Sequence, residues 1–189
     1  MPALNLQPHK LYHIYNRGNN RETIFYSPEN YRFFLTKLRR YLTSHLRILA
    51  WCLMPNHFHL LVQVRENADL SRCSTDLRLL LSSYTRAIQR QYGRTGSLFQ
   101  QHTKAKELAS NEYALACFCY IHQNPLRAGM VRELAQWVWS SYPDYAGLRN
   151  GTLCDQSAAA QVLDLPTEAA QMARLIQHTL PEDIAGVLY

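Results

Sequence analysis

The sequence predicts an α+β fold, in which helices cover one face of an antiparallel sheet. Three short stretches, at 11–15, 47–53 and 57–64, have the composition of β-strands. Two longer stretches, at 28–42 and 70–92, place apolar residues three or four positions apart, as in amphipathic helices. The 189 residues are 47% hydrophobic, which is enough to bury the core of one compact domain.

The first half of the chain predicts a strand, a helix and a strand pair. Strand 11–15 is followed by a turn signal at 17–20, which contains Gly18. Ser27 precedes Pro28, and this pair is typical of a helix start. Strands 47–53 and 57–64 are separated by only three residues, so we expect them to pair in the antiparallel sense.

The second half continues the alternation of helices and strands. Helix 70–92 ends at a turn over 93–97, and 98–108 is expected to be a strand. A further helix is expected to begin at Ser110 and to stop near Asn124, before Pro125. One amphipathic helix is predicted over 167–179. The order β-α-β-β-α-β is that of the ferredoxin-like, split βαβ fold, here with a C-terminal helical tail.

The charge of the chain is unevenly distributed. Residues 150–189 contain one basic and five acidic residues, a net charge of −4. Residues 1–149 contain 19 basic and nine acidic residues, a net charge of +10, and most of the basic residues are arginine. We therefore predict two segments, a basic body over 1–149 and an acidic tail over 150–189. An arginine-rich body suits a nucleic-acid partner, although a solvated surface would look the same.

The sequence also predicts where the protein resides. No apolar run is long enough to cross a membrane, and no signal peptide is visible at the N-terminus. The cysteine count is five, which is odd, and this suits reduced thiols. We expect a cytoplasmic, nucleoid-associated protein with no membrane partner.

Two groups of residues could carry chemistry. His57 and His59 are two positions apart on a predicted strand, so both imidazoles point to the same face, as two of the ligands of a metal site would. A half-buried polar pair is the alternative. Tyr120 and Asn124 share a helix face, where a phenol could act as a nucleophile and an amide oxygen as a metal ligand. Ordinary packing and a helix stop before Pro125 are the alternatives.

Together these groups resemble a known family, the single-tyrosine HUH transposases, named for a histidine–hydrophobic–histidine strand. The similar segments are HIYNRGN (13–19), AWCLMPNHFHLLV (50–62), GRTGSLFQ (93–100), YIHQNPLRAG (120–129) and WSSY (139–142). The most similar subgroup is the REP-associated tyrosine transposases, chromosomal relatives of insertion-sequence transposases. The resemblance covers about residues 8–149 and not the tail.

The resemblance implies a site and a reaction. His57, His59 and Asn124 would hold Mg²⁺ or Mn²⁺, with Asn124 in a position where many relatives carry glutamine. Tyr120 would be the nucleophile, Tyr113 is a weaker candidate, and His122 is expected to point away. The implied reaction cleaves and rejoins single-stranded DNA through a 5′-phosphotyrosine intermediate, and the implied target is a REP-type DNA hairpin. Relatives occur both as monomers and as homodimers.

DNA recognition is expected to involve arginines near the predicted loops and turns. These are Arg17, Arg21, Arg86, Arg90 and Arg94. Two other functions stay open. A domesticated protein of the same fold would hold hairpins without cleaving them, and an intact set of His57, His59, Tyr120 and Asn124 argues against it. An unrelated RNA-binding module would carry paired aromatic residues where His57 and His59 stand.

Overall fold

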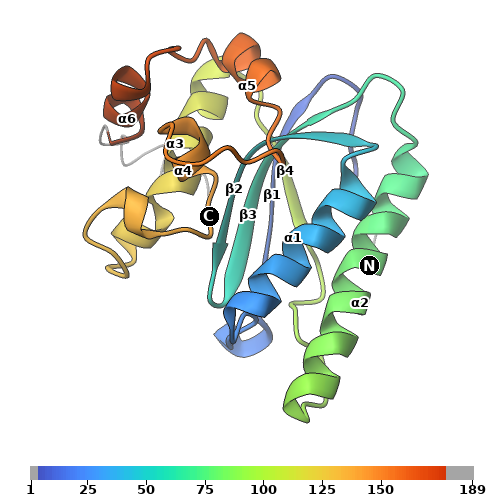
Figure 1. The fold of residues 1–189 in the computed structure, drawn as a ribbon. Coiled ribbons are helices and arrows are strands. Elements are labelled where there is room, and N and C mark those ends of the chain that lie inside the picture. Colours follow the sequence, from blue (N-terminus) through green and yellow to red (C-terminus); the bar gives the residue numbers. More distant parts are fainter. Residues whose placement is uncertain (1–3, 178–189) are drawn as a thin grey trace.

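The computed structural model describes residues 4–177, which form one four-stranded sheet with helices on both sides (Figure 1). The core elements follow the predicted order, and the bounds of β3 and α2 are those predicted. The elements are β1 (Leu11–Arg17), α1 (Pro28–Leu42), β2 (Leu46–Met54), β3 (His57–Val64), α2 (Leu70–Tyr92), β4 (Lys104–Glu107), α3 (Asn111–Arg127), α4 (Tyr142–Tyr145), α5 (Gln156–Leu163) and α6 (Ala169–Gln177), with short 3-10 helices at Asn19–Arg21 and Leu134–Gln136.

The strands lie in the order β2-β3-β1-β4, and each neighbouring pair is antiparallel. This order and the alternation with helices define the ferredoxin-like, split βαβ fold, which confirms the predicted fold class. In the pairing of β1 with β3, Tyr15 lies opposite His59 and Arg17 lies opposite His57. Side chains that lie opposite each other in a sheet point to the same face, so this register determines which residues share a surface.

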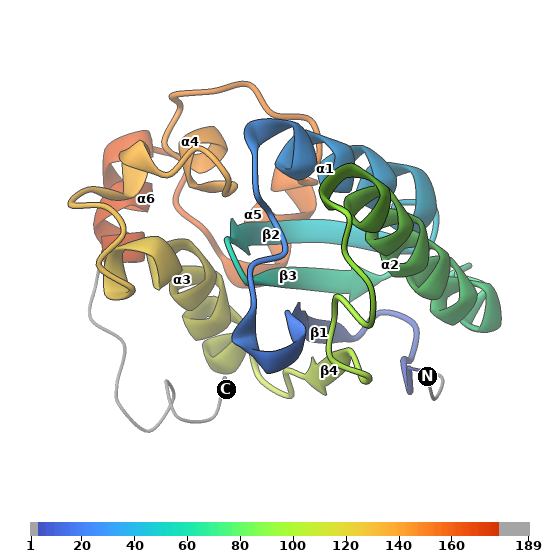
Figure 2. The same cartoon turned by 90° about the horizontal axis from the view of Figure 1, so that it is seen from below.

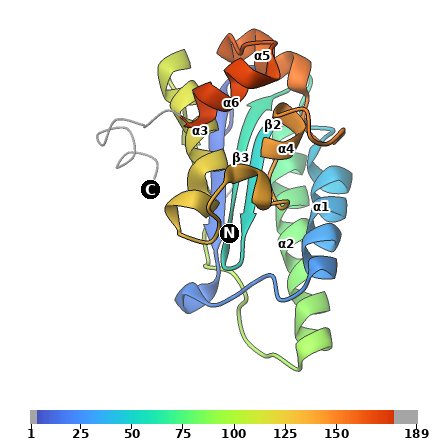
Figure 3. The same ribbon diagram turned by 60° about the vertical axis from the view of Figure 1, so that its left-hand side comes forward.

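The two faces of the sheet carry different helices. Helices α1 and α2 pack side by side on one face, as the view from below shows (Figure 2). Helix α3 crosses β2 and β3 on the other face, and α5 and α6 lie on the same side as α3 (Figure 3). The helices between strands thus occupy the single face that the sequence predicts, and α3 adds a layer opposite to them.

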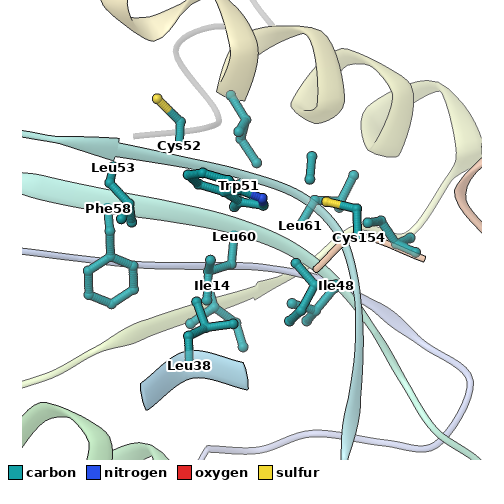
Figure 4. Close-up of a cluster of buried hydrophobic side chains, with 14 of the residues drawn as sticks. Ile14, Leu38, Ile48, Trp51, Cys52, Leu53, Phe58, Leu60, Leu61 and Cys154 are labelled. Atoms are coloured by element: carbon teal, nitrogen blue, oxygen red, sulfur yellow. The ribbon is translucent and has the colours of Figure 1, made fainter. Parts of the chain in front are cut away.

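The core between the sheet and α1 consists of interlocking apolar side chains. Ile14, Leu60 and Leu38 meet there, one from each of β1, β3 and α1 (Figure 4). The rings of Phe34 and Phe58 pack 5.2 Å apart at their centroids, which joins α1 to β3. Burying a large apolar side chain contributes about 1.5–3 kcal/mol, so these contacts hold β3 firmly against α1.

Local chemistry explains where the helices begin and end. Asp69 accepts a hydrogen bond from the backbone N–H of Arg72 and so caps the start of α2. Gly93 ends α2 in the left-handed conformation, with φ of 62°, where glycine has no steric penalty. Ser110 caps α3 in the same way as Asp69 caps α2, by accepting a hydrogen bond from the N–H of Tyr113.

Two element predictions are wrong in extent. The expected strand over 98–108 is a strand only at Lys104–Glu107, with an isolated bridge between Phe99 and Gly18 before it. Between the two, the Asn16 side chain binds the Gln100 carbonyl and the Thr103 hydroxyl, which interrupts the ladder. Helix α3 does not stop at Pro125 but continues to Arg127. Pro125 has no N–H to donate to the Ile121 carbonyl, but the N–H of Ala128 donates to the Asn124 carbonyl, so helical hydrogen bonding resumes after the proline.

The acidic segment begins with two helices rather than one. Helix α5 is not predicted from the sequence, and α6 lies within the helix predicted over 167–179, whose last two residues are outside the described range. Ile176 on α6 is fully buried, and α6 packs against α3. The Gln123 side chain on α3 donates a hydrogen bond to the Ile176 carbonyl. The described part of the tail therefore packs on α3. The segment boundary at residue 149 stays a prediction.

A short segment between α3 and the tail attaches α3 to the sheet edge. The Ser141 hydroxyl lies 2.7 Å from Nε2 of His122 on α3 and accepts from the backbone N–H of Trp51 on β2. Asp144 holds this segment in shape through a two-bonded ion pair with Arg149. Within residues 4–177, no helix has both the length and the apolar character that crossing a membrane requires.

Candidate functional site

The sheet face that α3 covers carries the predicted histidine pair. Side chains alternate along a strand, so His57 and His59 point to this face while Phe58 points into the core against α1. The register of β1 adds Tyr15 and Arg17 to the same face. The alternation of side chains along the strands therefore places the apolar Phe58 on the α1 face of the sheet and these polar residues on the α3 face.

Each histidine of the pair is held through its Nδ1 atom. Nδ1 of His57 lies 2.6 Å from Oδ1 of Asn56, and Nδ1 of His59 lies 2.9 Å from Nε2 of His13. The two rings are 4.9 Å apart at their centroids and nearly perpendicular. Within the described chain, Nε2 of His57 and Nε2 of His59 are buried without a hydrogen-bond partner. Both Nε2 atoms are therefore the ones suited to binding a cation.

Burial keeps these imidazoles in the neutral form that binds metals. Burial, together with the nearby Arg17 guanidinium, lowers the pKa of His57 to about 4, and an interaction with the Asn124 side chain partly opposes that shift. Burial and the neighbouring His13 and His57 lower the pKa of His59 well below its ordinary value. A neutral imidazole offers a lone pair, whereas a protonated one repels a cation.

Tyr120 lies on α3 directly beside the histidines. Its ring centroid is 5.6 Å from that of His59 and 6.2 Å from that of His13, and the rings meet edge to face. The side chain is only 1% exposed. Tyr113 begins the same helix two turns earlier and is 39% exposed, so the structure places Tyr120, and not Tyr113, against the histidines.

Asn124 follows Tyr120 by one helical turn. Its Nδ2 donates to the Tyr120 carbonyl at 2.9 Å, and a carbonyl can only accept, so the orientation of the amide is fixed. Its Oδ1 is then the atom available to a ligand. The Asn124 side chain also interacts with His57, where it raises the pKa of the imidazole against the effect of burial. His57, His59, Tyr120 and Asn124 are thus brought together, whereas His122 points away and contacts Ser141.

This donor set fits a divalent cation. Two imidazole nitrogens without hydrogen-bond partners lie on β3 and one amide oxygen lies on α3, and such a mixed set is compatible with Mn²⁺ or Mg²⁺. Residues 4–177 contain no metal-binding group built from three or more histidine, cysteine, aspartate or glutamate side chains. Asn124 offers an amide oxygen as a candidate third donor beside the two histidines.

A cavity of about 500 Å³ opens beside the histidines. Basic and polar side chains dominate its wall, including Arg17, which the sequence predicts as a DNA contact. Lys104 and His102 were not predicted, and the pairing of Lys104 with Tyr15 across β4 and β1 is what brings Lys104 to this face. The lining residues are Tyr15, Asn16, Arg17, Asn56, His57, His59, Gln100, His102 and Lys104.

The other predicted arginines lie outside the cavity. Arg21 is in the loop after β1, and its carbonyl accepts from the Asn56 side chain. Arg86 and Arg90 are exposed on α2, which packs on the opposite face of the sheet. Arg94 is paired with Glu22. The structure does not bring these four together with the histidines, and their contact with DNA stays a prediction.

Sequence reasoning missed two residues of the site, His13 and Asn56. His13 lies in the first strand, and no other candidate ligand lies at a regular spacing from it in the sequence. Only the pairing of β1 with β3 shows that it meets His59. Asn56 directly precedes His57 in the turn between β2 and β3, where it reads as a turn residue. Both residues lie in segments that carry the family resemblance, and the structure shows which histidine each of them contacts.

The chain is similar to a protein of known structure and matches the model of a known family. A solved structure of a REP-associated tyrosine transposase bound to a REP hairpin superposes with a TM-score of 0.60 and 20% identity, covering 84% of this chain and 96% of that chain. At this identity the likeness shows the shared fold. The model of the family described as "Transposase IS200 like" matches residues 8–124. The chain belongs to the IS200-like transposase family.

One curated relative also matches. It is a candidate REP-associated tyrosine transposase of Haemophilus influenzae, 26% identical over 103 residues. The matched region covers 50% of this chain and 57% of the relative, so it spans little more than half of the relative's length.

Proposed function

We propose that this protein cleaves and rejoins single-stranded DNA, with Tyr120 as the nucleophile and with His57, His59 and Asn124 as the ligands of Mg²⁺ or Mn²⁺. The observation that carries the proposal is the contact of Tyr120 with His59. Nε2 of His59 is buried without a hydrogen-bond partner and is one of the three proposed metal-binding atoms. Membership of the IS200-like transposase family supports it. One chain supplies all four residues, so the proposed chemistry needs no second subunit.

The proposed reaction exchanges one phosphate ester for another. The Tyr120 oxygen attacks the scissile phosphorus and loses its proton, while the bond from phosphorus to the 3′ oxygen breaks and that oxygen gains a proton. The products are a 5′-phosphotyrosine link and a free 3′-OH. A 3′-OH can reverse the step and rejoin the strand, and no nucleotide triphosphate is required because an ester bond is conserved.

The residues of the site would hold and orient the reacting groups. When bound, the divalent cation would supply Lewis-acid stabilisation of the charge on the phosphate oxygens. His57 and His59 approach that position from β3, and Asn124 approaches it from α3, so the docking of α3 on the sheet aligns nucleophile and ligands. Imidazole also suits Zn²⁺, so the metals are to be tested separately.

The proposed substrate is a DNA hairpin with a short single-stranded flank. The fold neighbour is a protein bound to a REP hairpin, which suggests the class of DNA. The cavity beside His57 is lined by Arg17 and Lys104, whose charges suit a phosphate backbone. A single strand suits this site because Tyr120 is on the face of α3 that meets the sheet and is almost fully buried, so a complementary strand would obstruct the approach of the phosphate.

One observation favours a second function, hairpin binding without cleavage. Tyr120 is 1% exposed, so a phosphate can reach it only if neighbouring groups move. A domesticated protein that holds DNA would need no such movement. The two functions differ in a single product, the covalent adduct between protein and DNA.

The experiment is incubation with hairpin oligonucleotides that carry single-stranded flanks, with Mg²⁺, Mn²⁺, Zn²⁺ or EDTA, followed by a denaturing gel. We expect an adduct that requires a divalent metal and disappears in Tyr120→Phe. Tyr113→Phe is the matched control on the same helix, and it should retain the adduct because Tyr113 is exposed and remote from His59.

Each outcome separates the alternatives. An adduct that survives Tyr120→Phe would assign the nucleophile to another residue. Tight hairpin binding with no adduct, across these metals and several flank sequences, would support the binding protein instead. An adduct that forms equally well in EDTA would contradict the proposed metal site.

A further inference from the structure

The two polar atoms of the Asn56 side chain have different partners. Nδ2 donates to the backbone carbonyl of Arg21 at 3.1 Å, and Oδ1 lies 2.6 Å from Nδ1 of His57. A carbonyl can only accept, so the group that faces Arg21 must be the amide NH₂. The Arg21 carbonyl therefore fixes the amide orientation and turns Oδ1 toward His57.

The orientation of Asn56 in turn selects the tautomer of His57. An amide oxygen can only accept, so Nδ1 of His57 must carry the proton. The lone pair of the neutral ring is then on Nε2, the buried atom that lacks a hydrogen-bond partner within residues 4–177. In water, neutral imidazole of histidine favours the opposite tautomer, with the proton on Nε2, and that form could not bind a cation through Nε2.

The loop that carries the Arg21 carbonyl is itself well defined. Gly18 donates its N–H to the Asn56 carbonyl at 2.7 Å, and the N–H groups of Ile24 and Phe25 donate to the Pro55 carbonyl, so several hydrogen bonds join the loop to the β2–β3 turn. Arg21 has φ of 60°, a left-handed conformation that turns the backbone at that residue. A Cβ on Gly18 would lie 2.0 Å from the Glu22 carbonyl oxygen, so only glycine fits the loop at that position.

We propose that Asn56 is a positioning residue that sets the tautomer of His57 and so presents Nε2 to a divalent cation, and that the Arg21 carbonyl sets the orientation of Asn56. The inference rests on the proposed function, in which His57 is a metal ligand. It connects the loop after β1 with the metal site through one amide. Hydrogen bonds to the second ring nitrogen of a metal-bound histidine commonly have this orienting role.

The test compares Asn56→Ala with Asn56→Asp in the DNA-free protein. Alanine removes both hydrogen bonds, whereas a carboxylate still accepts from Nδ1 of His57 but cannot donate to Arg21. Nitrogen NMR of histidine-labelled, metal-free protein reports which ring nitrogen carries the proton. Titration with Mn²⁺ alone, followed by electron paramagnetic resonance, gives the metal affinity.

We expect His57 in the unmodified protein to be protonated on Nδ1. Asn56→Ala should move the proton mainly to Nε2 and weaken Mn²⁺ binding by about 10–100-fold. Asn56→Asp should keep the proton on Nδ1 and bind Mn²⁺ at least as tightly as the unmodified protein. Asn19→Ala, an exposed change in the same loop, is the control and should change neither measurement.

The outcomes separate this inference from the proposed function. An Asn56→Ala protein that is folded by its amide spectrum and keeps the proton on Nδ1, or that binds Mn²⁺ within twofold of the unmodified protein, overturns the inference. Mn²⁺ affinity that is unchanged in His57→Ala contradicts the metal site of the proposed function instead. The tautomer measurement contains no metal, so it decides the role of Asn56 in either case.

Discussion

Nε2 of His13 lies 2.9 Å from Nδ1 of His59, so a buried hydrogen bond joins the first and third strands on the face that carries the site. His13 is fully buried, and burial, together with the charge of Lys106, lowers its pKa to about 3. His13 therefore meets His59 as a neutral ring, whose Nε2 can accept a hydrogen bond from Nδ1 of His59. His13 and Asn56 have parallel roles, because each holds the Nδ1 atom of one histidine of the pair.

The first prediction concerns His13. His13→Phe keeps a planar ring but removes the acceptor, so His59 loses the group that orients it. We expect Mn²⁺ affinity to fall by about 10–100-fold, as measured by paramagnetic resonance titration. His102→Ala, at the rim of the cavity, is the control for loss of a histidine and should bind Mn²⁺ normally. Equal affinities of the His13 variant and the unmodified protein would contradict an orienting role.

The second prediction concerns Arg17, which lines the cavity beside His57. Arg17→Ala should weaken hairpin binding and reduce the slope of log affinity against log salt by about 1, because one phosphate contact is lost. Fluorescence anisotropy at several salt concentrations measures this slope. Arg86→Ala removes the same charge from the opposite side of the sheet, so comparing the two shows whether bound DNA extends to α2. An unchanged slope in Arg17→Ala would place the DNA elsewhere.

The third prediction concerns Ser141, which links α3 to β2. Ser141→Ala leaves Nε2 of His122 and the N–H of Trp51 without the hydroxyl that they share. Burying unsatisfied polar groups costs about 1–3 kcal/mol, and we expect the free energy of unfolding in urea to fall by that amount. Ser44→Ala, an exposed serine, should change it by less than about 0.5 kcal/mol. If the two variants had the same free energy of unfolding, the hydrogen bonds of Ser141 would not contribute to stability.

The fourth prediction concerns the docking of α6 on α3. Ile176 is fully buried there, so Ile176→Ala should leave a cavity and lower the free energy of unfolding by about 2–5 kcal/mol. Leu148→Ala is the control, because Leu148 is 64% exposed and its loss should have little effect. Faster amide hydrogen exchange in α3 of the Ile176 variant would show that α6 supports the helix that carries Tyr120. Unchanged stability would mean that α6 is not a structural support.

Local sequence patterns predicted the elements whose signals are local. The bounds of β3 and α2 agree with the prediction because a tight turn and a glycine C-cap, Gly93, mark where they begin or end. The predicted strand over 98–108 is too long because backbone pairing with the end of β1 breaks off after Gln100, whose carbonyl is bound by the side chain of Asn16, 84 residues earlier in the chain. Helix α3 continues past Pro125 because the Ala128 N–H bonds to the Asn124 carbonyl beyond it, which composition alone does not reveal.

The site was predictable in its core and not in its surroundings. His57 and His59 are two apart on one strand and Tyr120 and Asn124 are four apart on one helix, so each pair is fixed by local geometry. That the two pairs meet was suggested by the family resemblance. The roles of His13 and Lys104 depend on strand register, which is a property of the folded sheet. For the same reason, the sequence could not show that Arg86 lies on the far layer from the histidines.

The alternation along β3 also limits how this site can be altered. His57 and His59 are separated by Phe58, whose ring packs against Phe34, so the strand cannot gain or lose one residue without exchanging the two faces. An insertion between the two histidines would place them on opposite faces of the sheet, so that one imidazole would enter the apolar layer. Point substitutions at the histidines, in contrast, leave that layer untouched. An engineer could therefore redesign metal preference on one side of the strand while the other side preserves the scaffold.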